Sequence, residues 1–227
     1  MGKRAIILCS SIEHPVYPYL LQWQQNNELG KQVSIINDKA QISAGTEFLF
    51  LVSCSQIINA DLRAKFKHVL VLHASDLPRG RGWSPHIWDV LAGKDNITIS
   101  LLEAQDQVDT GDIWRKISIP LSGTELYDEI NHLLFESELE LIEWALNNAE
   151  YVQPQSQAIA INEGEDDLAM QASYYPKRIP EDSLIDIDKS IAEQFDLLRV
   201  CDPQRFPAYF DYKGQRYTLA IKKTTQD

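Results

Sequence analysis

The sequence lacks long hydrophobic runs and contains little cysteine. No stretch approaches the roughly 20 consecutive apolar residues that a membrane-spanning helix needs, and the apolar start is short enough to be a buried strand. The three cysteines, Cys9, Cys54 and Cys201, are odd in number and widely spaced, which argues against a disulfide framework and a zinc-type spacing. We therefore expect a cytoplasmic protein with no membrane association and no bound metal.

Positive charge is also scarce. The 227 residues include 21 Lys and Arg against 33 Asp and Glu, which gives a net charge of −12. A protein that binds nucleic acid must neutralise several phosphates with clustered basic residues. Only small basic groups are found, at Arg79 and Arg81 and at Lys177 and Arg178. They suit one phosphorylated small molecule better than a tRNA, so no nucleic-acid partner is expected.

Glycine is missing where a dinucleotide site would need it. Residues 8–13, directly after the first apolar run, read LCSSIE and offer no glycine for close backbone approach to a pyrophosphate. A nicotinamide or flavin enzyme is therefore disfavoured.

What the sequence does contain is an alternation of short apolar runs with helical stretches. This pattern predicts an α/β fold with a Rossmann-like, mostly parallel sheet flanked by helices. The unbroken apolar runs are typical of strands buried on both faces, and such sheets bind ligands beyond the carboxyl ends of their strands. The expected strands are 4–9, 32–36, 47–52, 68–73, 97–103 and 113–119, and the first helix is 17–27.

We divide the chain into a first domain, 1–150, an acidic connection, 151–173, and a small C-terminal region, 174–227. A capping box at Ser122–Glu125 is expected to open the long helix that closes the first domain near residue 148.

The small C-terminal region combines a helix with a β-hairpin. The helix is expected over 190–200 with Asp188 as its cap. The hairpin pairs 208–212 with 215–221 across Lys213-Gly214.

Two polar residues stand where a ligand crevice is expected. His73 ends a strongly apolar strand and introduces a loop rich in glycine and proline, although a core histidine bonded to backbone would look the same. Asp109 lies in a turn after a later strand, although an ordinary β-turn aspartate would fit there too. A histidine and a carboxylate on neighbouring loops would form an acid–base pair in which the carboxylate orients the ring. His86, in the loop after His73, is a weaker candidate.

Two segments resemble signatures of the folate-dependent formyltransferase family, which includes methionyl-tRNA formyltransferase. Residues 73–88, HASDLPRGRGWSPHIW, resemble H-x-S-x-L-P-x-x-R/K-G-x-x-P-x-x-W, and residues 109–113, DTGDI, resemble D-x-G-x-I at the expected distance downstream. Further resemblance over 175–186, 198–203 and 206–210 matches the segment that follows the catalytic domain in sugar and tRNA formyltransferases. The short remainder after the hairpin and the acidic charge favour the sugar-nucleotide branch.

The resemblance implies a transferase that moves a formyl group from 10-formyl-tetrahydrofolate to the amine of a UDP- or dTDP-linked 4-amino-4,6-dideoxy sugar. Other small amines, methionyl-tRNA and a catalytically impaired homologue that only binds folate or nucleotide remain alternatives. Similar sugar formyltransferases dimerise through the region after the catalytic domain, so a homodimer is expected.

The resemblance also assigns residues. It implies that His73 is the general base, that Asp109 orients it, and that Ser75 shapes the loop or bonds near the centre. The expected folate-binding residues are Ser53, Cys54, Ser55, Leu77, Pro78, Asp106 and Val108. The expected substrate-binding residues are Arg79, Trp83, His86, Lys177, Arg178, Arg205, Phe206 and Tyr209.

One position departs from the family pattern. Relatives of the best-known type carry asparagine two residues before the signature histidine, and this chain has Val71. Valine cannot donate a hydrogen bond to an oxyanion. Ser75, a backbone N–H or a water is expected to supply that stabilisation, or the chemistry is slow or absent.

Overall fold

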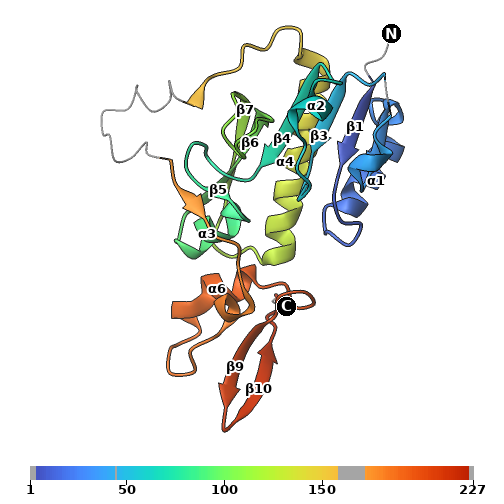
Figure 1. The fold of residues 1–227 in the computed structure, drawn as a ribbon. Coiled ribbons are helices and arrows are strands. Elements are labelled where there is room, and N and C mark those ends of the chain that lie inside the picture. Colours follow the sequence, from blue (N-terminus) through green and yellow to red (C-terminus); the bar gives the residue numbers. More distant parts are fainter. Residues whose placement is uncertain (1–3, 44, 158–171, 225–227) are drawn as a thin grey trace.

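A six-stranded sheet forms the centre of the molecule. The computed structural model describes residues 4–43, 45–157 and 172–224. The strands lie in the order β2-β1-β3-β4-β6-β7 (Figure 1). Their bounds are β1 Ala5–Leu8, β2 Val33–Ile36, β3 Phe48–Leu51, β4 His68–His73, β6 Asn96–Glu103 and β7 Ile113–Pro120. The predicted mostly parallel α/β fold is confirmed.

The direction of β6 decides how the two signature segments meet. Strands β1, β2, β3 and β4 are mutually parallel, whereas β6 runs antiparallel to both β4 and β7. Glu103 at the end of β6 pairs with Leu70, and Ser100 pairs with His73. The turn after β6 therefore leaves the sheet short of His73 and must fold back to reach it.

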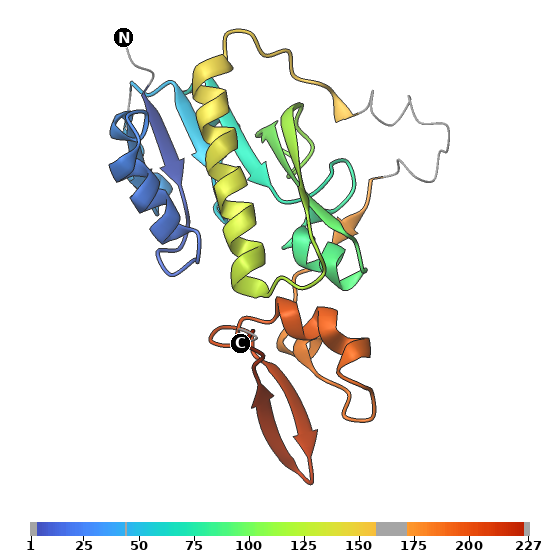
Figure 2. The ribbon, with the colours of Figure 1, turned by 180° about the vertical axis from the view of Figure 1, so that it is seen from behind.

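The main core lies between the sheet and the helices on one of its faces. Helices α1, Tyr17–Asn26, and α4, Tyr127–Asn148, both cover this face (Figure 2). Leu20 of α1 and Ile142 of α4 share one buried cluster with Ile7 and Phe50 of the sheet. The opposite face buries a smaller cluster that includes Ile6, Leu49 and Val69. Alternate residues of each strand thus point to opposite faces, as the pleat requires.

The start of α4 differs from the prediction. Glu125 does accept hydrogen bonds from the backbone of Ser122 and Gly123, but these bonds close a local turn ahead of the helix. The helix begins at Tyr127, where Glu129 accepts from the backbone N–H of Leu126. The expected capping box at Ser122 is therefore wrong by about one helical turn.

Shorter elements complete the first part of the chain. They are the helices α2, Ala60–Arg63, and α3, Pro85–Leu91, the 3₁₀ turns η1, Gly30–Gln32, and η2, Lys39–Gln41, and the strand β5, Arg81–Gly82. Residues 74–84 of the first signature connect β4 to α3, and we call them the first signature loop. Helix α3 follows this loop and packs against β6.

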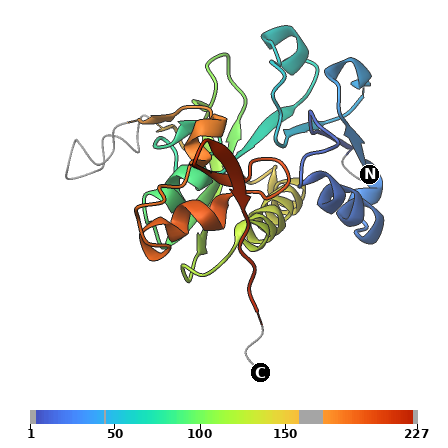
Figure 3. The same ribbon diagram turned by 90° about the horizontal axis from the view of Figure 1, so that it is seen from below.

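The C-terminal part lies against α3 and the start of α4 (Figures 1 and 3). It contains η3, Pro180–Ser183, η4, Ala192–Gln194, α6, Phe195–Val200, and the hairpin of β9, Ala208–Tyr212, and β10, Gln215–Leu219. The buried Arg199 of α6 contacts Glu125 just before α4. The hairpin prediction is confirmed, and Lys213 and Gly214 both adopt the positive φ angles of a tight hairpin turn.

Two details of the C-terminal part differ from expectation. Ser190 rather than Asp188 caps the helical segment, because Ser190 Oγ accepts from the N–H of Glu193 and Glu193 accepts from the N–H of Ser190. In addition, β8, Tyr174–Tyr175, pairs with β5 of the first signature loop. Within the described residues, no helix is long and apolar enough to cross a bilayer.

Candidate active site

His73 and Asp109 meet beside the end of β4. His73 Nδ1 lies 3.5 Å from Asp109 Oδ1. Both residues are buried, with His73 and Asp109 each 7% exposed. The structure thus brings together the two residues that the sequence nominated from separate segments.

The hydrogen-bond partners of this pair fix its orientation. His73 Nε2 lies 2.9 Å from the carbonyl oxygen of Gly80. A carbonyl oxygen only accepts, so this contact assigns a proton to Nε2 and leaves Nδ1 facing the carboxylate. Asp109 Oδ2 accepts from the backbone N–H of Gly82 at 2.9 Å. The first signature loop therefore contacts both members of the pair.

Two signature glycines are required by close backbone approach. Gly82 has a φ of +99°, and a Cβ there would collide with the backbone oxygen of Tyr175. A Cβ at Gly111 would collide with the backbone oxygen of Glu103. The two loops can lie this close to their neighbours only without side chains at these positions. Asp109 itself has a φ of 60°, a conformation that aspartate tolerates better than most residues.

Ser75, Leu77 and Pro78 are buried within the first signature loop. Ser75 is 1% exposed, and its Oγ has no hydrogen-bond partner within the residues that the structure describes. Leu77 is also 1% exposed and packs against Leu102, Ile113 and Val71. The side chain of Leu77 is thus part of the core, so this loop offers a ligand mainly its backbone.

The remaining residues expected to contact folate lie on two segments. Ser53, Cys54 and Ser55 form the turn after β3, where Ser10 Oγ lies 3.5 Å from Cys54 Sγ and accepts from the N–H of Ser55. Asp106 is an exposed side chain that pairs with Arg63 at 2.5 Å.

Val71 and Val108 are close in sequence to His73 and Asp109. Val71 shares one face of β4 with His73, two residues on, and packs at the border of the smaller apolar cluster beside Cys54 and Ala104. Val108 directly precedes Asp109 and is 56% exposed.

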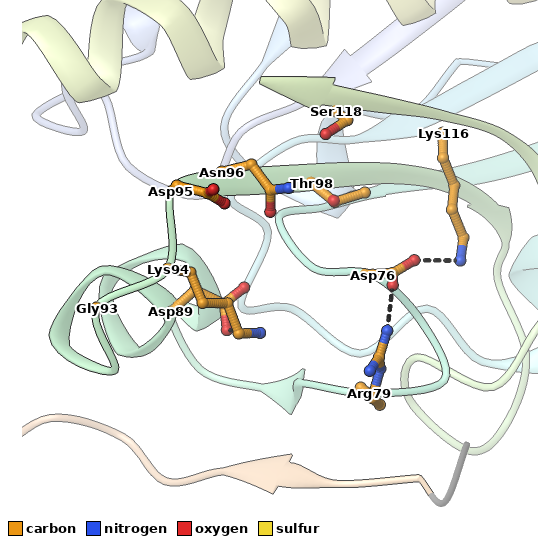
Figure 4. Close-up of a pocket in the computed structure, with 10 residues that line it drawn as sticks. All are labelled: Asp76, Arg79, Asp89, Gly93, Lys94, Asp95, Asn96, Thr98, Lys116 and Ser118. Carbon is orange, nitrogen blue, oxygen red and sulfur yellow. Dashed lines mark hydrogen bonds and ion pairs between the residues drawn. The ribbon is translucent and has the colours of Figure 1, made fainter. Parts of the chain in front are cut away.

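A polar groove of about 780 Å³ is lined by Asp76 and Arg79 of the first signature loop and by residues from the end of α3, β6 and β7 (Figure 4). Its basic side chains are paired within its own walls. Asp76 binds both Arg79, at 2.7 Å, and Lys116, at 2.6 Å, while Lys94 binds Asp89 at 2.7 Å. Burial alone would raise the pKa of Asp76, but the hydrogen bonds from Lys116 and Arg79 outweigh it and lower that pKa. Arg79, an expected substrate residue, is therefore already paired with Asp76, which it shares with Lys116.

Two expected substrate residues form an aromatic–cation pair. The Lys177 ammonium lies 5.1 Å from the centre of the Trp83 ring, and Trp83 is 45% exposed. Trp83 directly follows Gly82, whose N–H binds Asp109. This pair is therefore anchored close to Asp109.

A second aromatic–cation pair lies before the hairpin. The Arg205 guanidinium lies 5.4 Å from the centre of the Phe206 ring, and Phe206 is 53% exposed. Tyr209 does not offer such a platform, because it is only 6% exposed and Arg216 covers its ring at 4.0 Å. Arg178 is engaged in local structure, where it donates to Asp182 O and Ser183 Oγ.

His86 is held in its neutral form. Burial, followed by electrostatic interactions with the rings of His14 and His73, lowers the pKa of His86 to about 4. Burial and the neighbouring Arg205 likewise lower the pKa of His14 to about 4. His86 Nδ1 is buried and has no partner in the described part of the chain. A neutral imidazole at this place can exchange hydrogen bonds but carries no charge toward a phosphate.

One buried residue at the site was missed by the sequence analysis. Gln157 was assigned to the acidic connection, yet it is 4% exposed and its amide donates to Asp109 O and Gly111 O at 2.9 Å each. A single glutamine in an unpatterned segment gives no signal of its own. No group of side chains suited to a metal ion occurs among the described residues.

Comparison with known sequences gives a family match over most of the chain. Residues 6–146 match the family model described as formyl transferase. The methionyl-tRNA formyltransferase of Desulfotalea psychrophila is 32% identical over 160 residues, which cover 68% of this chain and 45% of that protein. The chain spans about half the length of such curated relatives.

Solved structures share the fold over nearly the whole chain. Methionyl-tRNA formyltransferase from Clostridium thermocellum superposes with a TM-score of 0.73 at 24% identity and covers 98% of this chain and 94% of its own. HypX from Aquifex aeolicus in complex with tetrahydrofolic acid gives a TM-score of 0.72 at 17% identity. The match covers 97% of this chain and 38% of HypX. A sugar N-formyltransferase from Shewanella sp. gives a TM-score of 0.67 at 14% identity and 99% coverage of both chains.

Proposed function

Because the chain belongs to the formyl transferase family, we propose that it transfers a formyl group from 10-formyl-tetrahydrofolate to the amine of a nucleotide-linked 4-amino sugar. The observation that carries this proposal is the buried contact between His73 and Asp109, at 3.5 Å. The two residues come from the two segments that resemble the family signatures. A histidine and a carboxylate in contact provide the proton transfer that amide formation requires.

The surroundings of the pair suit a folate. Val71, Cys54 and Ala104 pack against the smaller apolar cluster, and the exposed Val108 directly precedes Asp109; we expect a flat pteridine to lie against such apolar groups. The backbone of the Ser53–Ser55 turn and that of the Leu77-Pro78 loop complete the expected contacts. Bound 10-formyl-tetrahydrofolate would supply the formyl group at this place. A complex of HypX with tetrahydrofolic acid, a protein of the same fold, supports the choice of donor.

The geometry of His73 defines its part in the reaction. With Nε2–H directed at Gly80 O, the neutral ring keeps its lone pair at Nδ1. The 3.5 Å between Nδ1 and Asp109 Oδ1 is longer than an ordinary N–H···O bond, so an amine placed beside the pair can donate to Nδ1. As the amine nitrogen bonds to the formyl carbon, its proton passes to Nδ1, and Asp109 stabilises the imidazolium that results. The proton can then pass to the departing folate nitrogen.

The positive charge of the imidazolium also compensates for the absence of an asparagine at position 71. The tetrahedral species carries negative charge on the formyl oxygen. Val71 cannot donate a hydrogen bond to it, and Ser75 Oγ is buried away from the surface. We assign the electrostatic stabilisation of this negative oxygen to protonated His73.

The acceptor is assigned from charge and from two exposed aromatic groups. A net charge of −12 opposes a large polyanion such as tRNA. Trp83 with Lys177 and Phe206 with Arg205 each combine an aromatic face with a cation, which suits a nucleobase and its phosphates. The Shewanella sugar N-formyltransferase, which shares the fold over 99% of both chains, is consistent with this acceptor class.

The test is a product assay. The protein is incubated with 10-formyl-tetrahydrofolate and a panel of UDP- and dTDP-linked 4-amino-4,6-dideoxyhexoses, and products are detected by mass spectrometry. The proposal predicts a mass gain of one formyl group on at least one sugar nucleotide. A panel without product, in the presence of intact donor, contradicts it.

Methionyl-tRNA is the second candidate acceptor, because the first matched curated relatives carry that name. The same donor is incubated with charged initiator tRNA at low salt. Formylated methionyl-tRNA together with no sugar product would establish this acceptor instead.

A further inference from the structure

Gln157 joins the two signature loops through one side chain. Its Nε2 donates to Asp109 O and to Gly111 O, both at 2.9 Å. Its Oε1 accepts from Arg81 Nη2 at 2.6 Å. Both amide hydrogens and the amide oxygen are therefore used, on a side chain that is 4% exposed.

The backbone delivers Gln157 to this place. Gln155 and Ile113 exchange N–H···O bonds of 2.8 Å in each direction, so the segment before Gln157 runs alongside the start of β7. Two residues later the side chain enters the turn that carries Asp109. The side chain of Gln155 points to solvent.

The bonded turn is the one whose geometry sets the catalytic contact. Asp109 has a φ of 60°, and its carboxylate is shared between His73 on one oxygen and Gly82 on the other. Gln157 bonds the carbonyl groups of Asp109 and Gly111 and so fixes the Asp109–Thr110 and Gly111–Asp112 peptide planes. A rotation of these planes would turn the carboxylate away from His73.

We infer that Gln157 is a positioning residue that holds Asp109 against His73 by clamping the turn to Arg81. The inference rests on the proposed formyl transfer for its kinetic readout, but the clamp itself is a property of the free protein. Residues that orient a catalytic group in this way typically contribute about 10- to 100-fold in activity.

The test compares three variants. Gln157→Leu removes all three hydrogen bonds. Gln157→Glu keeps the length and the contact to Arg81 but cannot donate to the carbonyls of Asp109 and Gly111. Gln155→Leu is the matched control, because the same change is made two residues earlier on an exposed side chain. Both Gln157 variants should lower kcat about 10- to 100-fold, with little change in KM for the folate donor or for the sugar-nucleotide acceptor. The control, Gln155→Leu, should behave as wild type.

A second measurement separates positioning from general loss of folding. In the folded, ligand-free protein, the Gly82 amide and the His73 ring nitrogens should change NMR chemical shift in both Gln157 variants and not in Gln155→Leu. On an Asp109→Asn background, Gln157→Leu should cost less than threefold further in kcat.

These two readouts also separate the inference from the proposed function. Unchanged Gly82 and His73 signals in the Gln157 variants overturn the clamp, whether or not the wild type makes product. Changed signals together with undiminished turnover overturn the positioning role. If the wild type forms no product at all, the formyl-transfer proposal fails while the NMR shifts still decide the clamp.

Discussion

His73 Nδ1 and Asp109 Oδ1 lie 3.5 Å apart in a pocket of backbone contacts supplied by the first signature loop. Gly80 binds the far side of the imidazole, and Gly82 binds the far side of the carboxylate. The loop thus orients both groups toward one another. This arrangement explains why His73 and Gly82 belong to one signature.

The first prediction concerns Gly111. A side chain there would collide with Glu103 O, so Gly111→Ala should destabilise the fold by about 3 kcal/mol or more and abolish turnover. Gly123→Ala is the control, because a Cβ at Gly123 meets nothing within 4 Å, and its positive φ should cost only about 1 kcal/mol. Urea unfolding measures both variants. Equal losses of unfolding free energy in the two variants would show that the turn at Gly111 tolerates a side chain as well as Gly123 does.

The second prediction concerns the missing asparagine. Val71→Asn restores a donor beside His73, and one oxyanion donor is worth about a hundredfold in kcat. We expect turnover to rise about tenfold or more. The new amide replaces a methyl group that packs against Leu77, so the unfolding free energy should fall by about 1–2 kcal/mol. Val71→Ala controls for lost packing and should not raise turnover. A Val71→Asn enzyme no faster than wild type would argue against an electrostatic deficit at this position.

Features of the fold that depend on a few neighbouring residues could be predicted from the sequence, and features that depend on distant residues could not. The continuous apolar run of β4 and the Lys213-Gly214 turn carried enough local information to predict their boundaries. The reversed direction of β6 was not predicted, because hydrophobic pattern shows burial and not strand direction. The start of α4 was misplaced because Ser122 and Glu125 form a cap-like turn that the helix does not continue.

The site showed the same division. His73 and Asp109 were predicted from two signatures, and the structure places their side chains 3.5 Å apart; their catalytic role stays a prediction. Gln157 was not, because its burial depends on the pairing of Gln155 with Ile113 across the fold. The availability of Tyr209 was also misjudged, since Arg216 reaches its ring from the neighbouring strand.

The third prediction concerns the aromatic groups assigned to the nucleotide. Trp83→Ala and Phe206→Ala should each raise KM for the sugar nucleotide about tenfold, because a stacking and cation–π contact is worth on the order of 1 kcal/mol. Their effect on KM for the folate donor should be small. Tyr212→Ala removes a similar exposed pair, with Lys213 at 5.4 Å, from the hairpin turn and should leave both constants unchanged. An equal rise in the control would indicate a general effect on the C-terminal part.

The fourth prediction concerns Glu138, which is 5% exposed in α4. Burial raises the pKa of this carboxyl to about 8 from an ordinary value of 4.5. Between these values the folded chain keeps a proton that the unfolded chain has lost, so the unfolding free energy should fall as pH rises from about 5 to 8. Glu138→Gln cannot titrate. The unfolding free energy of Glu138→Gln, taken relative to that of wild type, should therefore increase by up to about 1.4 kcal/mol per pH unit.

Denaturant unfolding at several pH values measures this difference. Glu140→Gln is the control, since Glu140 is an exposed residue of the same helix and should leave the pH dependence as in wild type. Parallel pH curves for wild type and Glu138→Gln would show that Glu138 is ionised in the folded protein.

The most direct test of the account is a double-mutant cycle on His73 and Asp109, the proposed catalytic pair. Formyl transfer to the accepted sugar nucleotide is measured for wild type, His73→Ala, Asp109→Asn and the double variant, with thermal unfolding as the check on folding. If the two groups act as one unit, each single change should lower kcat by about 10²- to 10⁴-fold, and the double variant should be no slower than the slower single variant. Losses that multiply in the double variant, or singles that keep wild-type turnover, would contradict the assignment of formyl transfer to this pair.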